Sequence, residues 1–237
     1  MVHRENTVLP RGGTDVLGWV ARVGAVTGQA LAEVQGSTLA SARAQLAAGE
    51  RRGLLFGQRP LATQPRLYTV TRAGLRRCGE HGLEPCRVNI SGAMHLITCA
   101  RVAARLQRRY PGTRVTGERE LRRDEREQGR PLASARLRTG PDGRPLLHRP
   151  DLILRPIPSE GTVGAKSDDL PVAVEVELTV KAPRRLEEIV VAWARCRLVA
   201  GVIYVVAPEV EHALTRALDR ARAGAEIAVV PLAALDR

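Results

Sequence analysis

Three carboxylates in the C-terminal half have the types and spacing expected of a divalent-metal site. Glu175 and Glu177 lie two residues apart in the alternating segment 172–180, so in a strand both side chains point to one face. Carboxylates on an otherwise apolar strand are costly unless they are solvated, paired or bound to a cation. Asp151 follows Pro150 at the head of another predicted strand and supplies a third oxygen ligand. The set predicts Mg²⁺ or Mn²⁺, which would polarise a phosphodiester and lower the pKa of a water.

A solvent-facing edge strand is the simpler alternative for this alternating segment, because many strands have one wet face. Lys181 lies on the same predicted strand face as the two glutamates and would add a positive charge to a catalytic site. The order of the surrounding elements favours the metal site: a Glu-containing segment, Pro-Asp, a loop, Glu-x-Glu on a strand, a helix and an apolar strand. We therefore expect Asp151, Glu175, Glu177 and Lys181 to act together.

Other polar residues are weaker candidates. The accessory residues that we expect near the acids are Glu118, Glu120, His148 and Arg184. His95 lies on a predicted helix, where a lone histidine is more often packed or hydrogen-bonded than catalytic. The four cysteines favour reduced thiols, since the spacing of Cys78, His81 and Cys86 matches none of the paired zinc patterns.

The N-terminal part has the pattern of a winged helix-turn-helix over residues 14–80, after a flexible arm at 1–13. Helices are predicted at 15–26, capped by Thr14, at 28–34, and from an N-cap at Ser37 to about residue 53. Apolar runs at 54–56 and 66–70 flank a turn-rich stretch and predict a β-hairpin, and a short helix reaches Cys78. The exposed side chains expected to contact DNA are Ser37, Thr38, Ser41, Arg43, Gln45, Arg59 and Arg66.

The rest of the chain reads as an α/β domain over residues 93–237, joined by a linker at 80–92. Helices are predicted at 93–110, 183–198 and 209–223. Strands are predicted at 113–120, 150–154, 172–180, 201–206 and 226–231, with a mobile loop or hairpin at 122–145 and a loop at 156–170. The fold class is therefore α/β, α+β overall, with a central mixed sheet in this domain.

The charge of the chain favours nucleic acid as its partner. The net charge is +12, and arginine provides 35 of the 37 basic residues because Lys166 and Lys181 are the only lysines. GC-rich coding explains part of the arginine excess, but not the surplus over acidic residues. A basic surface attracts phosphate backbones, whereas aromatic residues at 3% argue against single-strand binding by stacking. No run of 18–20 apolar residues or signal-peptide stretch is visible, so we expect a cytoplasmic protein without a membrane span.

These pieces together resemble the replication-relaxation family of bacterial plasmid and mobile-element proteins over residues 14 to about 207. The matching segments are RRGLL…YTVTRAG, the helix bearing His95, GERELR, HRPDLIL, AVEVELTVKAPRRLEEI and GVIYVVAP. The resemblance implies a winged helix joined to a PD-(D/E)XK restriction-endonuclease-like core. It also implies that Asp151 and Glu175 are metal ligands. Glu177 stands at the position where that pattern has a lysine. This departure concerns the expected nuclease activity and not the expected fold.

Two functions follow from this reading. The first is a metal-dependent DNA endonuclease or nickase of a plasmid or mobile element, targeted by its winged helix. The alternative is a non-catalytic DNA-binding regulator of replication, transfer or transcription with a degenerate nuclease fold; a scaffold for protein contacts is a third, weaker idea. Double-stranded DNA is the expected partner, a homodimer is left open, and no membrane partner is expected.

Overall fold

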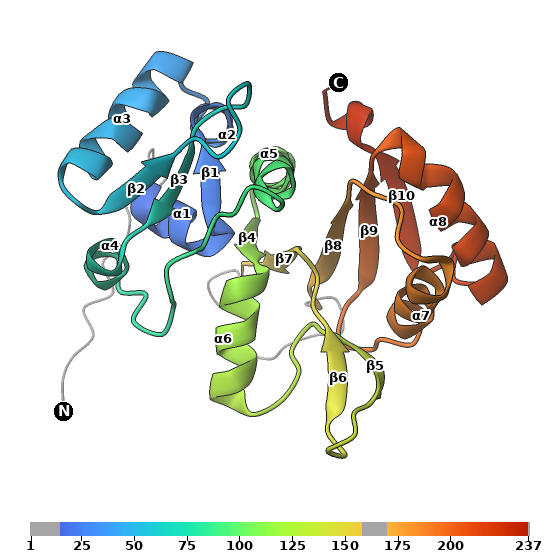
Figure 1. Ribbon diagram of the computed structural model, residues 1–237. Helices are drawn as coiled ribbons and strands as arrows, with labels where there is room; N and C mark the ends of the chain where they lie inside the picture. Colours follow the sequence, from blue (N-terminus) through green and yellow to red (C-terminus); the bar gives the residue numbers. More distant parts are fainter. Residues whose placement is uncertain (1–14, 158–169, 237) are drawn as a thin grey trace.

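A computed structural model describes residues 15–157 and 170–236, and shows a mixed α/β chain with three sheets (Figure 1). The predicted arm at 1–13 and most of the predicted loop at 156–170 lie outside the described residues. Helices of the described chain are α1 (Val16–Val23), α2 (Gly28–Gln35), α3 (Leu39–Arg51), α4 (Arg72–Arg77), α5 (Ala93–Arg109), α6 (Glu118–Gln128), α7 (Pro183–Ala194) and α8 (Pro208–Ala221), followed by the 3-10 turn η2 (Leu232–Asp236). Within these residues, no helix is long and apolar enough to cross a membrane.

The N-terminal helices surround a small antiparallel sheet of order β1-β3-β2. Its strands are β1 (Ala25–Thr27), β2 (Leu55–Gln58) and β3 (Leu67–Val70). The predicted pair β2–β3 is present, whereas β1 was not predicted. The first helix ends at Val23 rather than at residue 26, because Gly24 adopts a φ of 101° and turns the chain into β1.

Two helix starts differ from the predicted N-caps. The side chain of Asp15 accepts a hydrogen bond from the Gly18 N–H at 3.0 Å and caps α1; Thr14 lies outside the described residues. The third helix is capped by Thr38, whose hydroxyl accepts from the Ser41 N–H, and the prediction of Ser37 as the cap was wrong. The hydroxyl of Ser37 instead donates to the side chain of Gln35.

The central sheet is mixed, with strand order β10-β9-β8-β7-β4. Its strands are β4 (Thr113–Gly117), β7 (Leu152–Pro156), β8 (Val172–Glu177), β9 (Gly201–Val206) and β10 (Ile227–Pro231). The pairs β4–β7 and β7–β8 are antiparallel, and β8–β9 and β9–β10 are parallel. Figure 1 shows α5 between this sheet and the N-terminal elements, with α7 and α8 on the other side of the sheet.

Side-chain alternation along β8 divides the core between the two faces of the sheet. Val174 and Val176 belong to a hydrophobic cluster that runs from α1 through α5 to the sheet. Ala173 belongs to a second cluster with α7, α8 and β9. Glu175 has the same parity as Ala173, and its carboxylate meets Trp193 of α7. Both faces of the sheet are therefore covered, and Glu175 and Glu177 are buried rather than on a solvent-facing strand.

Further predicted boundaries were wrong. The strand at 113–120 ends at Gly117, and Glu118 and Glu120 lie in the first turn of α6. Gly117 permits this turn because a Cβ there would lie 2.9 Å from the Arg22 carbonyl oxygen. The region 122–145, which was predicted as a mobile loop or hairpin, begins with most of α6, which was missed. It then forms a hairpin of β5 (Ala135–Thr139) and β6 (Pro145–His148), as predicted.

The end of the acidic strand was also predicted wrongly. Strand β8 stops at Glu177, whose carbonyl oxygen accepts from the Ala207 N–H at 2.9 Å, and α7 begins with Pro183 at its first position. Thr179 and Lys181 consequently lie in the connecting segment. The alternating pattern had predicted instead that both continue the strand face of Glu175 and Glu177.

Candidate active site

A polar pocket of about 400 Å³ lies where α5, α6, β6 and the start of β7 approach the end of β8. All four residues predicted to act together line it. The lining residues are His95, Glu118, Arg122, Leu147, His148, Arg149, Asp151, Glu175, Val176, Glu177 and Lys181. The chain therefore brings into one pocket residues that are spread over more than a third of its length.

Asp151 occupies the turn before β7 and is held at both carboxylate oxygens. Its Oδ1 lies 2.9 Å from Nε2 of His95 on α5, and its Oδ2 accepts a hydrogen bond from the Val176 N–H at 2.8 Å. The backbone of Asp151 also accepts from the Glu118 N–H at 3.1 Å, which ties the start of α6 to the same turn. One residue thus connects α5, α6 and β8.

Glu175 is buried, with only 5% of its surface exposed. Its Oε1 accepts a hydrogen bond from Trp193 Nε1 at 2.9 Å and lies 2.7 Å from His148 Nε2. The rings of His148 and Trp193 meet edge to face at 5.8 Å. Burial raises the pKa of Glu175, while the hydrogen bond from His148 acts in the opposite direction. The histidine of the hairpin and the tryptophan of α7 therefore both fix the acid.

Glu177 is also buried, and its carboxylate accepts from the ammonium of Lys181. The connecting segment brings the lysine back to the acid four residues earlier, although the two do not share a strand face. Burial lowers the pKa of Lys181. The predicted proximity of Lys181 to the acids is thus present, by a different local structure from the one predicted.

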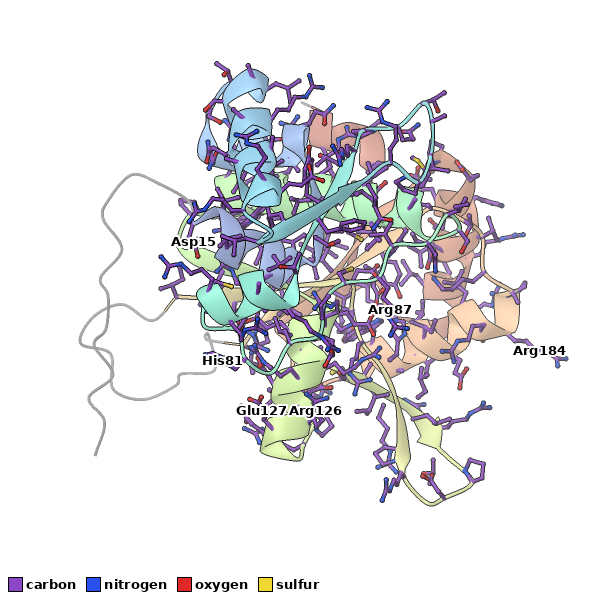
Figure 2. The ribbon with its side chains drawn as sticks, turned by 60° about the vertical axis from the view of Figure 1, so that its left-hand side comes forward. Asp15, His81, Arg87, Arg126, Glu127 and Arg184 are labelled. Atoms are coloured by element: carbon purple, nitrogen blue, oxygen red, sulfur yellow. The ribbon has the colours of Figure 1, made fainter. Side chains whose placement is uncertain are left out.

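The accessory residues separate into two groups. His148 and Glu118 line the pocket, and Glu118 contacts Arg122 one turn along α6. Glu120 does not line it: its carboxylate accepts from Arg114 at 2.5 Å, and burial raises its pKa. Arg184 is exposed on α7 and points away from the rest of the molecule (Figure 2).

A second group of possible metal ligands, His95, Cys99 and Asp151, borders the same pocket. The sequence had not predicted that these three residues come together. His95 and Cys99 are four residues apart on α5, and Cys99 Sγ lies 3.4 Å from His95 Nε2. One ligand atom of each, together with a carboxylate oxygen of Asp151, lie within 4.8 Å of one another. The hydrogen bond to Asp151 raises the pKa of His95, and burial raises the pKa of Cys99 well above its usual value.

The spacing H-x-x-x-C on one predicted helix was the available sign of this set, because residues four apart share a helix face. Nothing in the sequence shows that Asp151 meets that face. Among the residues that the structure describes, His95, Cys99 and Asp151 form the only group of three His, Cys, Asp or Glu residues whose ligand atoms lie this close together. The ligand atoms of Asp151, Glu175 and Glu177 do not come together in this way, and neither do those of Cys78, His81 and Cys86. All four cysteines are free.

The connection between α4 and α5 packs along α6, away from the pocket. Arg123 of α6 contacts the carboxylate of Glu80, and Arg126 donates to the Gly82 carbonyl oxygen at 3.4 Å. In Figure 2, His81 lies beside Arg126 and Glu127 at this end of α6. These contacts hold the predicted linker against the domain that it was expected to join.

The residues predicted to contact DNA have different surroundings. Ser41, Arg43 and Arg59 are exposed, as is the capping residue Thr38. Gln45 exchanges hydrogen bonds with Gln35 of α2 at 3.0 and 3.1 Å.

Arg66 braces the small sheet. It donates to Glu50 and to the Gly57 carbonyl oxygen, each at 2.7 Å, and its guanidinium lies over the Tyr68 ring at 5.4 Å. The guanidinium of Arg66 is therefore held by contacts within the chain and does not extend freely toward DNA, as the prediction had expected it to.

Comparisons with family models, with curated proteins and with solved structures find no match to this chain.

Proposed function

We propose that this protein binds double-stranded DNA and cuts it as a metal-dependent endonuclease or nickase. The observation that carries the proposal is the single pocket lined by Asp151, Glu175, Glu177 and Lys181. Buried acids that face an open polar pocket, rather than a sealed core, are typical of a site that binds a cation or a charged substrate.

The order of elements supports assigning the C-terminal part to the PD-(D/E)XK type and residues 14 to about 207 to the replication-relaxation family. Helix α6 carries a pocket acid, β7 follows the Pro-Asp pair, β8 bears Glu-x-Glu, and α7 leads to the apolar strand β9. In the same proposal, α1 to α4 with the hairpin β2–β3 form a winged helix.

The donor set fits Mg²⁺ or Mn²⁺, with Asp151 and Glu175 as the holding residues. Mg²⁺ usually binds one or two carboxylates and keeps several waters, so a closed group of three acids is not needed. A divalent cation there would supply a Lewis acid for the phosphodiester and lower the pKa of a water.

The protein's own residues supply the positive charges around the acids. Arg122, Arg149 and Lys181 line the pocket, and each already pairs with a glutamate of the chain. Their charges favour the approach of a phosphate, and Lys181 takes the place of the lysine that is absent at position 177. The pair formed by His148 and Trp193 orients Glu175 and keeps its carboxylate from swinging away.

Incubation of supercoiled and linear DNA with Mg²⁺ or Mn²⁺ tests the reaction. The wild-type protein should nick or linearise the plasmid, and Glu175→Gln should lower the rate on the order of 100-fold. Glu211→Gln, on the exposed first turn of α8, is the matched control and should cut normally. Equal cutting by Glu175→Gln, or none by any protein, contradicts the nuclease.

DNA binding by α3 and the hairpin is tested separately by the salt dependence of the affinity. Replacing Arg43 or Arg59 by alanine should weaken binding and lower the salt slope by about 1 for each lost phosphate contact. Arg216→Ala is the control, because α8 lies across the molecule from α3 (Figure 1). Unchanged affinity in both variants rules out this DNA-contacting face.

The non-catalytic regulator stays the second candidate, since one observation favours it. Each of Asp151, Glu175 and Glu177 already has a histidine or lysine partner, and the three do not form a closed ligand group within the described chain. In that case DNA binding survives in Glu175→Gln, with no cutting by any variant. The cutting and binding assays together decide between the two functions.

A further inference from the structure

We propose that His95, Cys99 and Asp151 bind a zinc ion, with a fourth coordination position open to the pocket. This inference concerns a different cation and two residues to which the proposed nuclease gives no role. It rests on the positions of three donor atoms and on the shape of their surroundings.

The distances suit a small tetrahedral ion. With metal–ligand bonds of about 2.0–2.3 Å, the edges of a tetrahedral site are roughly 3.3–3.8 Å long. Cys99 Sγ and His95 Nε2 are 3.4 Å apart, and His95 Nε2 and Asp151 Oδ1 are 2.9 Å apart. A separation of the imidazole and the carboxylate by a few tenths of an ångström would accommodate the ion, and the histidine is exposed enough to move, at 39% of its side chain.

The hydrogen-bonding pattern without a metal leaves this group imperfectly satisfied. One nitrogen, Nε2 of His95, faces both the thiol of Cys99 and the carboxylate of Asp151. An imidazole nitrogen either donates or accepts, so it cannot donate to the acid and accept from the thiol at the same time. A cation among the three atoms would bind all of them at once, with release of the thiol proton.

The supporting contacts position the ligands as in known metal sites. Asp151 Oδ2 accepts from the Val176 N–H at 2.8 Å, which orients the carboxylate while leaving Oδ1 toward His95. Cys99 is buried behind the pocket, whereas His95 and Asp151 line it, so an ion can enter from the pocket side.

The chemistry of the donors favours zinc over Mg²⁺. Thiolate and imidazole are ligands of Zn²⁺ and similar transition metals, and Mg²⁺ prefers oxygen. Three protein ligands with one open position is the arrangement of zinc sites that hold a water or a substrate. Asp151 belongs to this group and also to the carboxylates of the proposed nuclease. A cation bound at one site therefore neutralises part of the negative charge with which Asp151 would attract a cation to the other site.

Titration of tag-free, chelator-treated protein with Co²⁺ tests the site, since Co²⁺ replaces Zn²⁺ and reports its ligands in its absorption spectrum. We expect one equivalent to produce a thiolate-to-cobalt charge-transfer band and the visible bands of a tetrahedral ion. Zn²⁺ should abolish both. Cys99→Ser should remove the charge-transfer band, and His95→Gln should weaken binding by roughly 100-fold or more.

Matched variants make the outcome specific. Cys86→Ser changes a cysteine outside the group and should leave the spectrum unchanged. Circular dichroism checks that Cys99→Ser still folds. His95→Gln is a second variant that does not alter the core, because His95 is partly exposed. No charge-transfer band in the wild type, or a band that persists in Cys99→Ser, overturns the zinc site.

The glutamate variant separates this result from the nuclease. Glu175→Gln should keep the cobalt spectrum, because Glu175 is not among the three ligands. A normal spectrum in a protein that never cuts DNA would reject the nuclease alone. Metal-dependent cutting without the cobalt spectrum would reject the zinc site alone.

Discussion

Two groups of side chains meet at the pocket from opposite faces of the central sheet, and they are built differently. His95 and Cys99 share one face of a single helix, α5, so their spacing depends on helix geometry alone. Glu175 and Glu177 share a strand, but their partners come from the β5–β6 hairpin, from α7 and from the segment after β8. The first group is set by local structure, and the second requires several elements to pack correctly.

The two groups also differ in their ligand chemistry. The helix side offers a thiol and an imidazole, which suit a transition metal, and the strand side offers carboxylates, which suit a hard cation. Asp151 lies between them and contacts both α5 and β8. Changes that loosen the packing around β8 should therefore damage the carboxylate side and leave the helix side intact.

The largest effect is expected from Glu125→Ala. Glu125 is buried in α6 and accepts from Ser134 Oγ at 2.5 Å and from Arg149 Nε at 2.9 Å, next to His148. Its removal should lower the free energy of unfolding by about 3 kcal/mol, measured by urea denaturation. Hydrogen exchange of the β5–β6 hairpin should become faster.

Glu127→Ala on the exposed side of the same helix is the control for Glu125→Ala and should change stability little. The cobalt spectrum of the folded Glu125→Ala protein should persist. A lost spectrum would mean that the two sides of the pocket depend on each other.

A smaller effect is expected from Trp193→Phe, which removes the indole donor to buried Glu175 and keeps most of the ring volume. The lost hydrogen bond should lower the free energy of unfolding by about 1–2 kcal/mol. Trp19→Phe is an instructive control, because Trp19 is also buried but its Nε1 has no hydrogen-bond partner among the described residues. Equal losses in the two variants would show that ring packing, and not the bond to Glu175, sets the cost.

Lys181→Met should slow DNA cutting and also lower stability slightly. The side chain of Lys181 is 35% exposed, so solvent screens its pair with Glu177, but the variant leaves the buried Glu177 carboxylate without this partner and should lower the free energy of unfolding by about 1 kcal/mol. If the ammonium stabilises charge in the reaction, the rate of DNA cutting should fall roughly 100-fold. Arg184→Met, outside the pocket on α7, should cut like the wild type.

The smallest expected effect is a pH dependence of the metal-free protein. The hydrogen bond to Asp151 raises the pKa of His95 above its ordinary value of 6.5 in the folded state. Its contribution to stability is therefore complete below the pKa of the unfolded chain and is lost as the pH rises through the higher folded pKa.

Urea unfolding in chelator should show a difference between the wild type and His95→Gln that shrinks from about pH 6 upward. His212→Gln, exposed on α8, controls for loss of an imidazole elsewhere. A difference that is constant with pH would contradict the assigned pair.

Local patterns predicted most helices and strands of the described chain. The alternation of 172–180 correctly placed Glu175 and Glu177 on one side of a strand, because parity within a strand is independent of what packs around it. The boundaries were less predictable. Glu118 and Glu120 were expected near a strand, and only packing of Gly117 against the end of α1 shows where α6 begins. Within that helix the two acids point in different directions, and only Glu118 reaches the pocket.

The sequence by itself determined how each candidate side chain is directed on its own element: Glu175 and Glu177 have strand spacing, and His95 and Cys99 have helix spacing. The tertiary structure decided which of them meet. His95 lies 56 residues before Asp151 in the chain, and His148 lies 27 residues before Glu175. Contacts over such separations depend on how strands are ordered in the sheet and which helix covers each face. Spacing rules act over only a few residues, so they fix a side chain's direction on its own element but not the neighbour that it finds.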